Sequence, residues 1–101
     1  MSLSRTDDGE ETLLKIEGTL DAVNAPELRP TLDAVIGEKR KQINVELSAL
    51  RLIDSSGVAV FVSLLKRARA YGGNVKLLGL SGQPLAIFKM LQLDRVFPGL
   101  H

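Results

Sequence analysis

The 101-residue sequence contains no cysteine and no tryptophan, and its only histidine is His101. Without cysteine there are no disulfides or thiolate metal sites, as is common in a reducing compartment. A catalytic metal would have only carboxylates to bind it, and a serine nucleophile would have no histidine base except the last residue. The Gly-x-Ser-x-Gly pattern of hydrolases and the glycine-lysine pattern of phosphate-binding loops are also missing. We therefore predict no enzymatic activity, no metal and no cofactor.

Aromatic residues and net charge are low as well, with three phenylalanines, one tyrosine and a formal net charge of +1. These values argue against a nucleic-acid partner, which favours a basic surface and stacking side chains. The N-terminal segment is charged, unlike a signal peptide, and no apolar run approaches the roughly 18 residues that span a bilayer. We expect one cytoplasmic domain over residues 1–101, without membrane insertion, as a monomer or weak dimer.

Hydrophobic periodicity and turn residues predict an alternation of strands and helices. Helices that connect strands require some parallel pairing, so we predict an α/β (α+β-like) fold with a mixed sheet. Pro30 lies beyond the first turn of the first helix and predicts a kink or a late start. The expected elements are strands at 3–6 and 12–17, a connection at 18–23, a helix capped by Asn24 with Glu27 in a capping box and ending at Gly37, a strand at 42–47, a helix from Asp54 to about Tyr71, a strand at 74–80, a helix from Ser81 to about Leu91, and a short edge strand at 95–97.

The most informative segment is Leu52-Ile53-Asp54-Ser55-Ser56-Gly57, which lies between a strand-like run and the longest helical pattern. It places two hydroxyls and one carboxylate where a helix begins. Backbone N–H groups point outward there and the helix dipole is positive, so the position stabilises an anion, including a phosphate on a serine. The absence of a side chain at Gly57 would let a kinase active site approach closely. The alternative is that Ser56 is a plain helix-capping serine, while Asp54 caps or shapes the turn.

A helical wheel gives the second helix one apolar side, which includes Phe61 and Leu65. Ala59 and Ser63 fall on the opposite side. When the wheel is extended back by one turn, Ser56 falls on this outer side and Ser55 lies nearer the boundary of the core. Small exposed residues beside a reachable serine are what a docking face would present, although an exposed face that tolerates alanine gives the same pattern.

Three features of the chain resemble a STAS domain, most closely the bacterial anti-sigma-factor antagonists. They are Gly18-Thr19-Leu20-Asp21-Ala22, the strand Ile43-Asn44-Val45-Glu46-Leu47, and Leu52 to Val58 leading into the long helix. The ending Leu91-Gln92-Leu93 with Val96-Phe97 is also similar. The resemblance covers nearly the whole chain and implies a sheet of four or five strands with helices mainly on one face.

The resemblance also implies a phosphorylation switch at Ser56, with Asp21 near the site. In that family the unmodified protein binds an anti-sigma factor that is also a serine kinase, which frees a sigma factor. Phosphorylation of the antagonist breaks the complex, and a serine phosphatase restores it. Related domains act instead as accessory subunits of lipid-transporting ABC systems or as scaffolds of stress-sensing assemblies. The intact double serine favours the regulatory interpretation.

Overall fold

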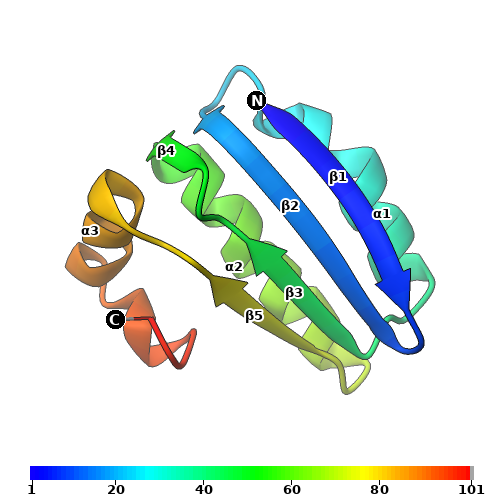
Figure 1. Ribbon diagram of the computed structural model, residues 1–101. Coiled ribbons are helices and arrows are strands. Elements are labelled where there is room, and N and C mark those ends of the chain that lie inside the picture. The colour runs from blue at the N-terminus through cyan, green and yellow to red at the C-terminus, as the bar shows by residue number, and fades with distance from the viewer. Residues whose placement is uncertain (101) are drawn as a thin grey trace.

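Two N-terminal strands, β1 (Ser2–Asp8) and β2 (Glu11–Leu20), form an antiparallel hairpin at one edge of the sheet. The computed structural model describes residues 1–100, and all further strands in it run parallel to β2 (Figure 1). Strand β3 (Gln42–Glu46) pairs with the first half of β2, and β5 (Asn74–Leu78) pairs with β3. Strand β4 (Leu50–Ile53) pairs with the last residues of β2, beyond the end of β3. The predicted mixed sheet is confirmed.

The helices lie mainly on one face of this sheet (Figure 1). After β2 come the 3₁₀ turn η1 (Ala25–Leu28) and helix α1 (Arg29–Gly37), and after β4 comes α2 (Ser55–Ala70). Helix α3 (Gly82–Met90) packs beside β4 and is followed by the 3₁₀ turn η2 (Leu93–Arg95). Both α1 and α2 connect parallel strands, and they run in the same direction. No helix within residues 1–100 is long and apolar enough to cross a membrane.

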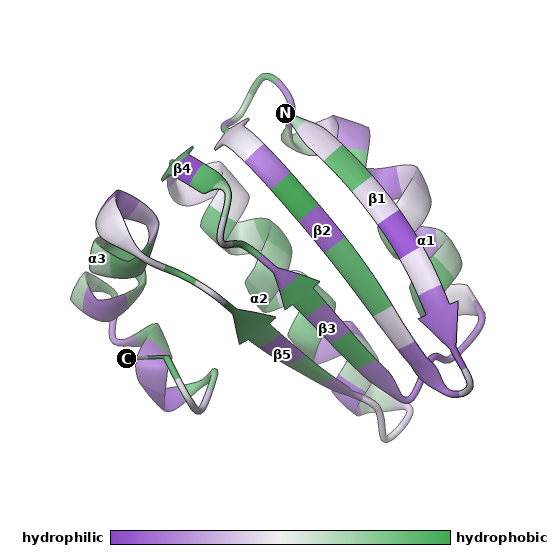
Figure 2. Ribbon diagram, viewed as in Figure 1, coloured by the Kyte–Doolittle hydropathy of each residue, from purple (hydrophilic) through white to green (hydrophobic). Residues whose placement is uncertain are grey.

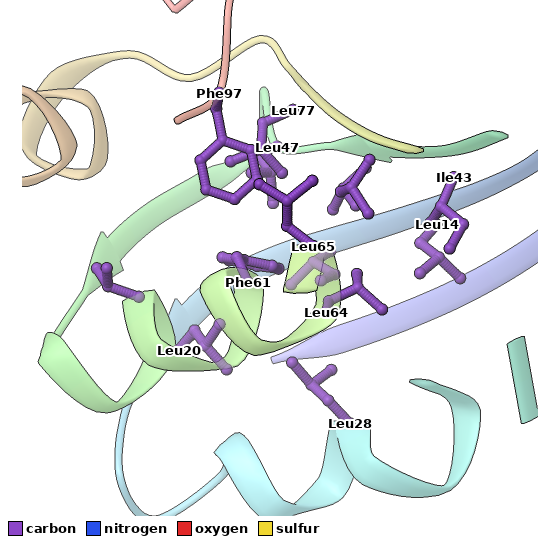
Figure 3. Close-up of a cluster of buried hydrophobic side chains, with 14 of the residues drawn as sticks. Leu14, Leu20, Leu28, Ile43, Leu47, Phe61, Leu64, Leu65, Leu77 and Phe97 are labelled. Atoms are coloured by element: carbon purple, nitrogen blue, oxygen red, sulfur yellow. The ribbon is translucent and has the colours of Figure 1, made fainter. Parts of the chain in front are cut away.

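The core fills the space between the sheet and these helices. Along β2, buried Thr12, Leu14 and Ile16 alternate with exposed residues. Figure 2 shows apolar and hydrophilic bands alternating in the middle of this strand, although the exposed Leu13 is apolar as well. Phe61, Leu64 and Leu65 of α2 enter the core, where Figure 3 shows them among apolar side chains of the sheet, of η1 and of the C-terminal segment. Leu64 is only 1% exposed, because η1 and α1 pack against this side of α2.

The strand predictions near the site need two corrections. Residues 18–20 are not a connection, because β2 continues through them and pairs with β4 after a bulge at Gly18, which has a φ of +94°. Residues 95–97 form no edge strand: Leu93–Arg95 is a 3₁₀ turn that carries Phe97 into the core. The fifth strand is β4 instead.

The start of the first helix differs from the prediction in one respect. Pro30 does delay it, since a 3₁₀ turn precedes α1 and Pro30 falls in the first turn of the α-helix proper. Asn24 precedes η1, but its side chain makes no capping hydrogen bond, so the predicted capping box with Glu27 is wrong. The Asn24 side chain is engaged in the loop described below.

Candidate functional site

Asp54 is the residue that connects the end of β4, the start of α2 and the loop after β2. Its extended backbone (φ −106°, ψ −177°) places it at the N-cap of α2, where Oδ1 accepts a hydrogen bond from the Gly57 N–H at 3.0 Å. Its Oδ2 accepts a second hydrogen bond from the Ala22 N–H, also at 3.0 Å. These backbone donors, Gly57 first, lower the pKa of Asp54 below its ordinary value. The capping role expected of Asp54 is thus observed, together with a tie to a second loop.

That second loop is built around Asp21 and Asn24. The Asp21 Oδ1 accepts hydrogen bonds from the N–H groups of Val23 and Asn24, and the Asn24 Oδ1 accepts one from the Asp21 N–H at 2.9 Å. The Asn24 Nδ2 donates to the Thr19 carbonyl at 2.7 Å, which explains why this side chain caps no helix. Ala22, the residue after Asp21, donates to Asp54, so this loop lies beside the Asp54 turn.

Gln83, at the start of α3, is a supporting residue that the sequence did not reveal. Its Oε1 accepts a hydrogen bond from the Ile53 N–H at 3.0 Å, and its Nε2 donates to the Ile53 carbonyl at 2.9 Å. The side-chain amide therefore satisfies the backbone N–H and carbonyl of Ile53, as a neighbouring strand would do. Ile53 is the residue immediately before Asp54. A glutamine thirty positions along the chain carries no sequence signal for such a contact.

The two serines of the motif open into different clefts. Ser56 lines a cleft of about 550 Å³ between α2 and the segment from Ala22 to Asp33, which includes η1 and the start of α1. Ser55 lines a second cleft, between α2 and the segment around Leu91 and Leu93. The structure reverses the order that the wheel predicts, because Ser55 is exposed and Ser56 is half-buried. The wheel treats α2 as an isolated cylinder, whereas the Ala22–Asp33 segment shields the side that carries Ser56.

Ala59 and Ser63 form an exposed ridge between the two clefts. Both residues are exposed, as predicted, and both line each cleft. Their short side chains make this ridge low. The structure thus brings Ser56, Ala59 and Ser63 to the same cleft, and it places Asp54 and the loop that contains Asp21 beside the start of α2.

Gly57 faces inward, which corrects the role assigned to it from the sequence. It is buried, and a Cβ atom there would lie 2.6 Å from Ile53 Cγ1 and 2.9 Å from Leu20 Cγ. Its missing side chain therefore lets the first turn of α2 sit directly on the ends of β2 and β4. Access for a kinase is not what this glycine provides.

Metal-binding geometry is not found within the described part of the chain, where no group of three or more histidine, cysteine, aspartate or glutamate residues converges. His101, the one histidine, lies outside the described residues. The chemistry that the site offers is that of a serine hydroxyl at a helix N-terminus, beside an open cleft and two carboxylates that are tied to backbone amides.

A family model and the curated relatives point to one family. Residues 3–101 match the model of the STAS domain family. The anti-sigma-B factor antagonist of Bacillus subtilis is 31% identical over 83 residues, which cover 82% of this chain and 75% of that protein.

Solved structures share the fold at lower sequence identity. An anti-sigma factor antagonist from Mycobacterium paratuberculosis superposes with a TM-score of 0.86 at 20% identity, covering 96% of this chain and 82% of that one. The Bacillus protein SpoIIAA in its phosphorylated form gives a TM-score of 0.76 at 21% identity, covering 93% and 86%. SpoIIAA in its unphosphorylated form gives 0.75 at 21% identity, covering 91% and 83%.

The inward position of Gly57 predicts that Gly57→Ala destabilises the fold. The added methyl group has to displace Ile53 and Leu20, so we expect a loss of about 1–3 kcal/mol in the free energy of unfolding. Urea denaturation followed by circular dichroism measures this loss. Gly37→Ala in α1 is the matched control, because a Cβ there meets nothing within 4 Å, and it should be neutral or slightly stabilising. Equal stability of Gly57→Ala and wild type would contradict this assignment.

The lowered pKa of Asp54 predicts how its contribution depends on pH. The pKa of Asp54 is lower in the folded chain than in the unfolded chain, where it is about 4. The stabilisation by Asp54 is therefore complete above about pH 4 and is lost as the pH falls through the folded-state pKa. Asp54→Asn should therefore lower the Tm by several degrees at pH 7, and the gap should narrow below about pH 4. Scanning calorimetry of both proteins from pH 7 to pH 3 tests this. A gap that stays constant over this range would show that the charge of Asp54 does not matter.

Proposed function

The chain belongs to the STAS domain family and, within it, to the anti-sigma factor antagonists, and from this membership we propose that it is a binding switch controlled at Ser56. In the proposed cycle, the unmodified chain binds an anti-sigma factor of the serine-kinase type and thereby frees a sigma factor. The kinase transfers the terminal phosphoryl group of ATP to the Ser56 hydroxyl, ADP leaves, and the complex separates. A serine phosphatase returns the chain to its binding form. The proposal places the chain in the cytoplasm, where such partners act.

The observation that carries the proposal is the position of Ser56 in the first turn of α2, where its side chain opens into a cleft instead of the core. A phosphate there adds a charge of about −1.5 to −2 at neutral pH, next to the positive end of the helix dipole. The fold has no need to rearrange to accept it. The similarity of this chain to SpoIIAA in both its phosphorylated and unphosphorylated forms, with TM-scores of 0.76 and 0.75, supports a switch that acts without refolding.

The surroundings of Ser56 explain how a phosphate would stop binding. The ridge of Ala59 and Ser63 is low, so a partner surface approaches α2 closely while Ser56 is unmodified. A phosphate adds both bulk and negative charge to this contact. Asp54 stays ionised near neutral pH because its pKa is lowered, and Asp21 lies in the loop that Asp54 holds. An acidic or closely packed partner surface would then face three negative groups.

Ser55 offers a competing hydroxyl, because it is the more exposed of the two serines. It lines the other cleft, against the segment around Leu91 and Leu93. A kinase that docks on the ridge and the cleft beside α1 reaches Ser56 rather than Ser55. The choice between the two serines is therefore also a test of which side of α2 the partner covers.

The test is intact-mass spectrometry after incubating the chain with ATP and the candidate anti-sigma kinases encoded in its own genome. We expect wild type and Ser55→Ala to gain one phosphate and Ser56→Ala to gain none. Co-elution on gel filtration should show a complex with the kinase for unmodified protein only.

If Ser56→Ala still gains a phosphate, or if Ser55→Ala gains none, Ser55 is the modified residue instead of Ser56. Absence of phosphate with every candidate kinase would overturn the proposal. The chain would then be an accessory subunit of a lipid-transporting ABC system or a scaffold of a stress-sensing assembly, with Ser56 acting only as part of a helix start.

A further inference from the structure

The cleft beside Ser56 has charged residues on both of its walls. Helices α1 and α2 run in the same direction, and the Arg67 Nη1 atom lies 2.9 Å from the Asp33 Oδ1 atom across the cleft. This exposed ion pair lies at the end of the cleft away from Ser56. Arg29 also lines the cleft, four residues before Asp33 and therefore about one turn closer to the Ser56 end.

The direction of side chains on a helix takes Arg29 further toward Ser56. Cα–Cβ bonds in a helix tilt toward its N-terminus, and long side chains lie over the preceding turn. Arg29 is the first residue of α1, so this tendency would direct its side chain back along η1, toward the end of the cleft that Ser56 lines. The residues that line this end of the cleft include Ala22, Ala25 and Ala59, which are too small to block the path.

Arg29 is the uncommitted cation of this cleft. Within residues 1–100 Arg29 makes no salt bridge and no side-chain hydrogen bond, whereas Arg67 is paired with Asp33. The nearby carboxylates are committed as well: Asp54 accepts from Gly57 and Ala22, and Asp21 accepts from Val23 and Asn24. A phosphate on Ser56 would thus meet one guanidinium without a partner, in addition to the positive end of the α2 dipole.

We propose that Arg29 forms an ion pair with the phosphate on Ser56, across the cleft between α1 and α2. The planar guanidinium matches two phosphate oxygens at once, so the pair is directional as well as charged. Phosphorylation then changes the surface in two ways, since it adds negative charge at Ser56 and withdraws the positive charge of Arg29 from the partner. This inference rests on Ser56 being the modified residue of the proposed function, but not on the identity of the kinase or of the partner.

The experiment uses full-length chain with phosphoserine inserted at position 56 during translation, so that no kinase is needed. The pH titration of its phosphorus NMR signal gives the second pKa of the phosphate, which is about 6 in an unperturbed phosphoserine. We expect a value below this in the otherwise unaltered chain, and an increase of about 0.5 in Arg29→Gln. Arg29→Lys keeps the positive charge but lacks the planar guanidinium, so the second pKa of its phosphate should lie between the values of the other two chains.

Arg69→Gln is the matched control, because it removes the same charge near the far end of α2, roughly 20 Å along the helix axis from Ser56. It should leave the titration of the phosphate unchanged. Equal titration of the Arg29→Gln and unaltered chains would overturn the ion pair, as would an equal shift in Arg69→Gln. Failure of every kinase to modify Ser56 would instead overturn the proposed function, and the titration with inserted phosphoserine would still report on Arg29.

Discussion

The two hydrogen bonds of the Asp54 carboxylate are the constraint on which the site depends. One oxygen holds the first turn of α2 through Gly57, and the other holds the loop after β2 through Ala22. Both contacts are possible because β2 and β4 are parallel neighbours, paired at Leu20 and Ile53, so that the segments after them leave the sheet together. Gly57 allows the turn to sit directly on these strand ends, and Gln83 secures Ile53 from the other side. The serine hydroxyls are thereby presented on a surface that is already organised.

This organisation explains how a single covalent group can control binding. Because the Asp54 turn is held by its own hydrogen bonds, the proposed phosphate on Ser56 would project into the cleft beside α1 without replacing any of them. In the proposed switch, its effect would fall on the ridge of Ala59 and Ser63 and on the charges around the cleft, among them Arg29. A surface switch of this kind would suit the proposed exchange of partners, in which the modified and unmodified chains keep one fold.

The sequence predicts the features that depend on local pattern and misses those that depend on packing. The apolar face of α2, the hairpin and the cap at Asp54 follow from periodicity and residue type, and the structure has them. Strand β4 escapes prediction because its burial does not alternate: two exposed residues lie between Leu50 and Ile53, and β4 exists only through its pairing with β2. The exposure of Ser55 and Ser56, the inward role of Gly57 and the position of Arg29 all depend on how neighbouring elements pack around α2, which a helical wheel does not contain.

The most direct test of a switch that acts without refolding is the thermal unfolding of the chain with phosphoserine inserted at position 56, compared with that of the unmodified chain at the same pH and salt concentration. The account predicts that the Tm values agree within about 3 °C, because the helix dipole offsets part of the added charge and the hydrogen bonds of Asp54 remain. A drop of about 10 °C or more, or loss of the cooperative transition, would contradict it. Such a result would mean that phosphorylation acts by loosening the start of α2.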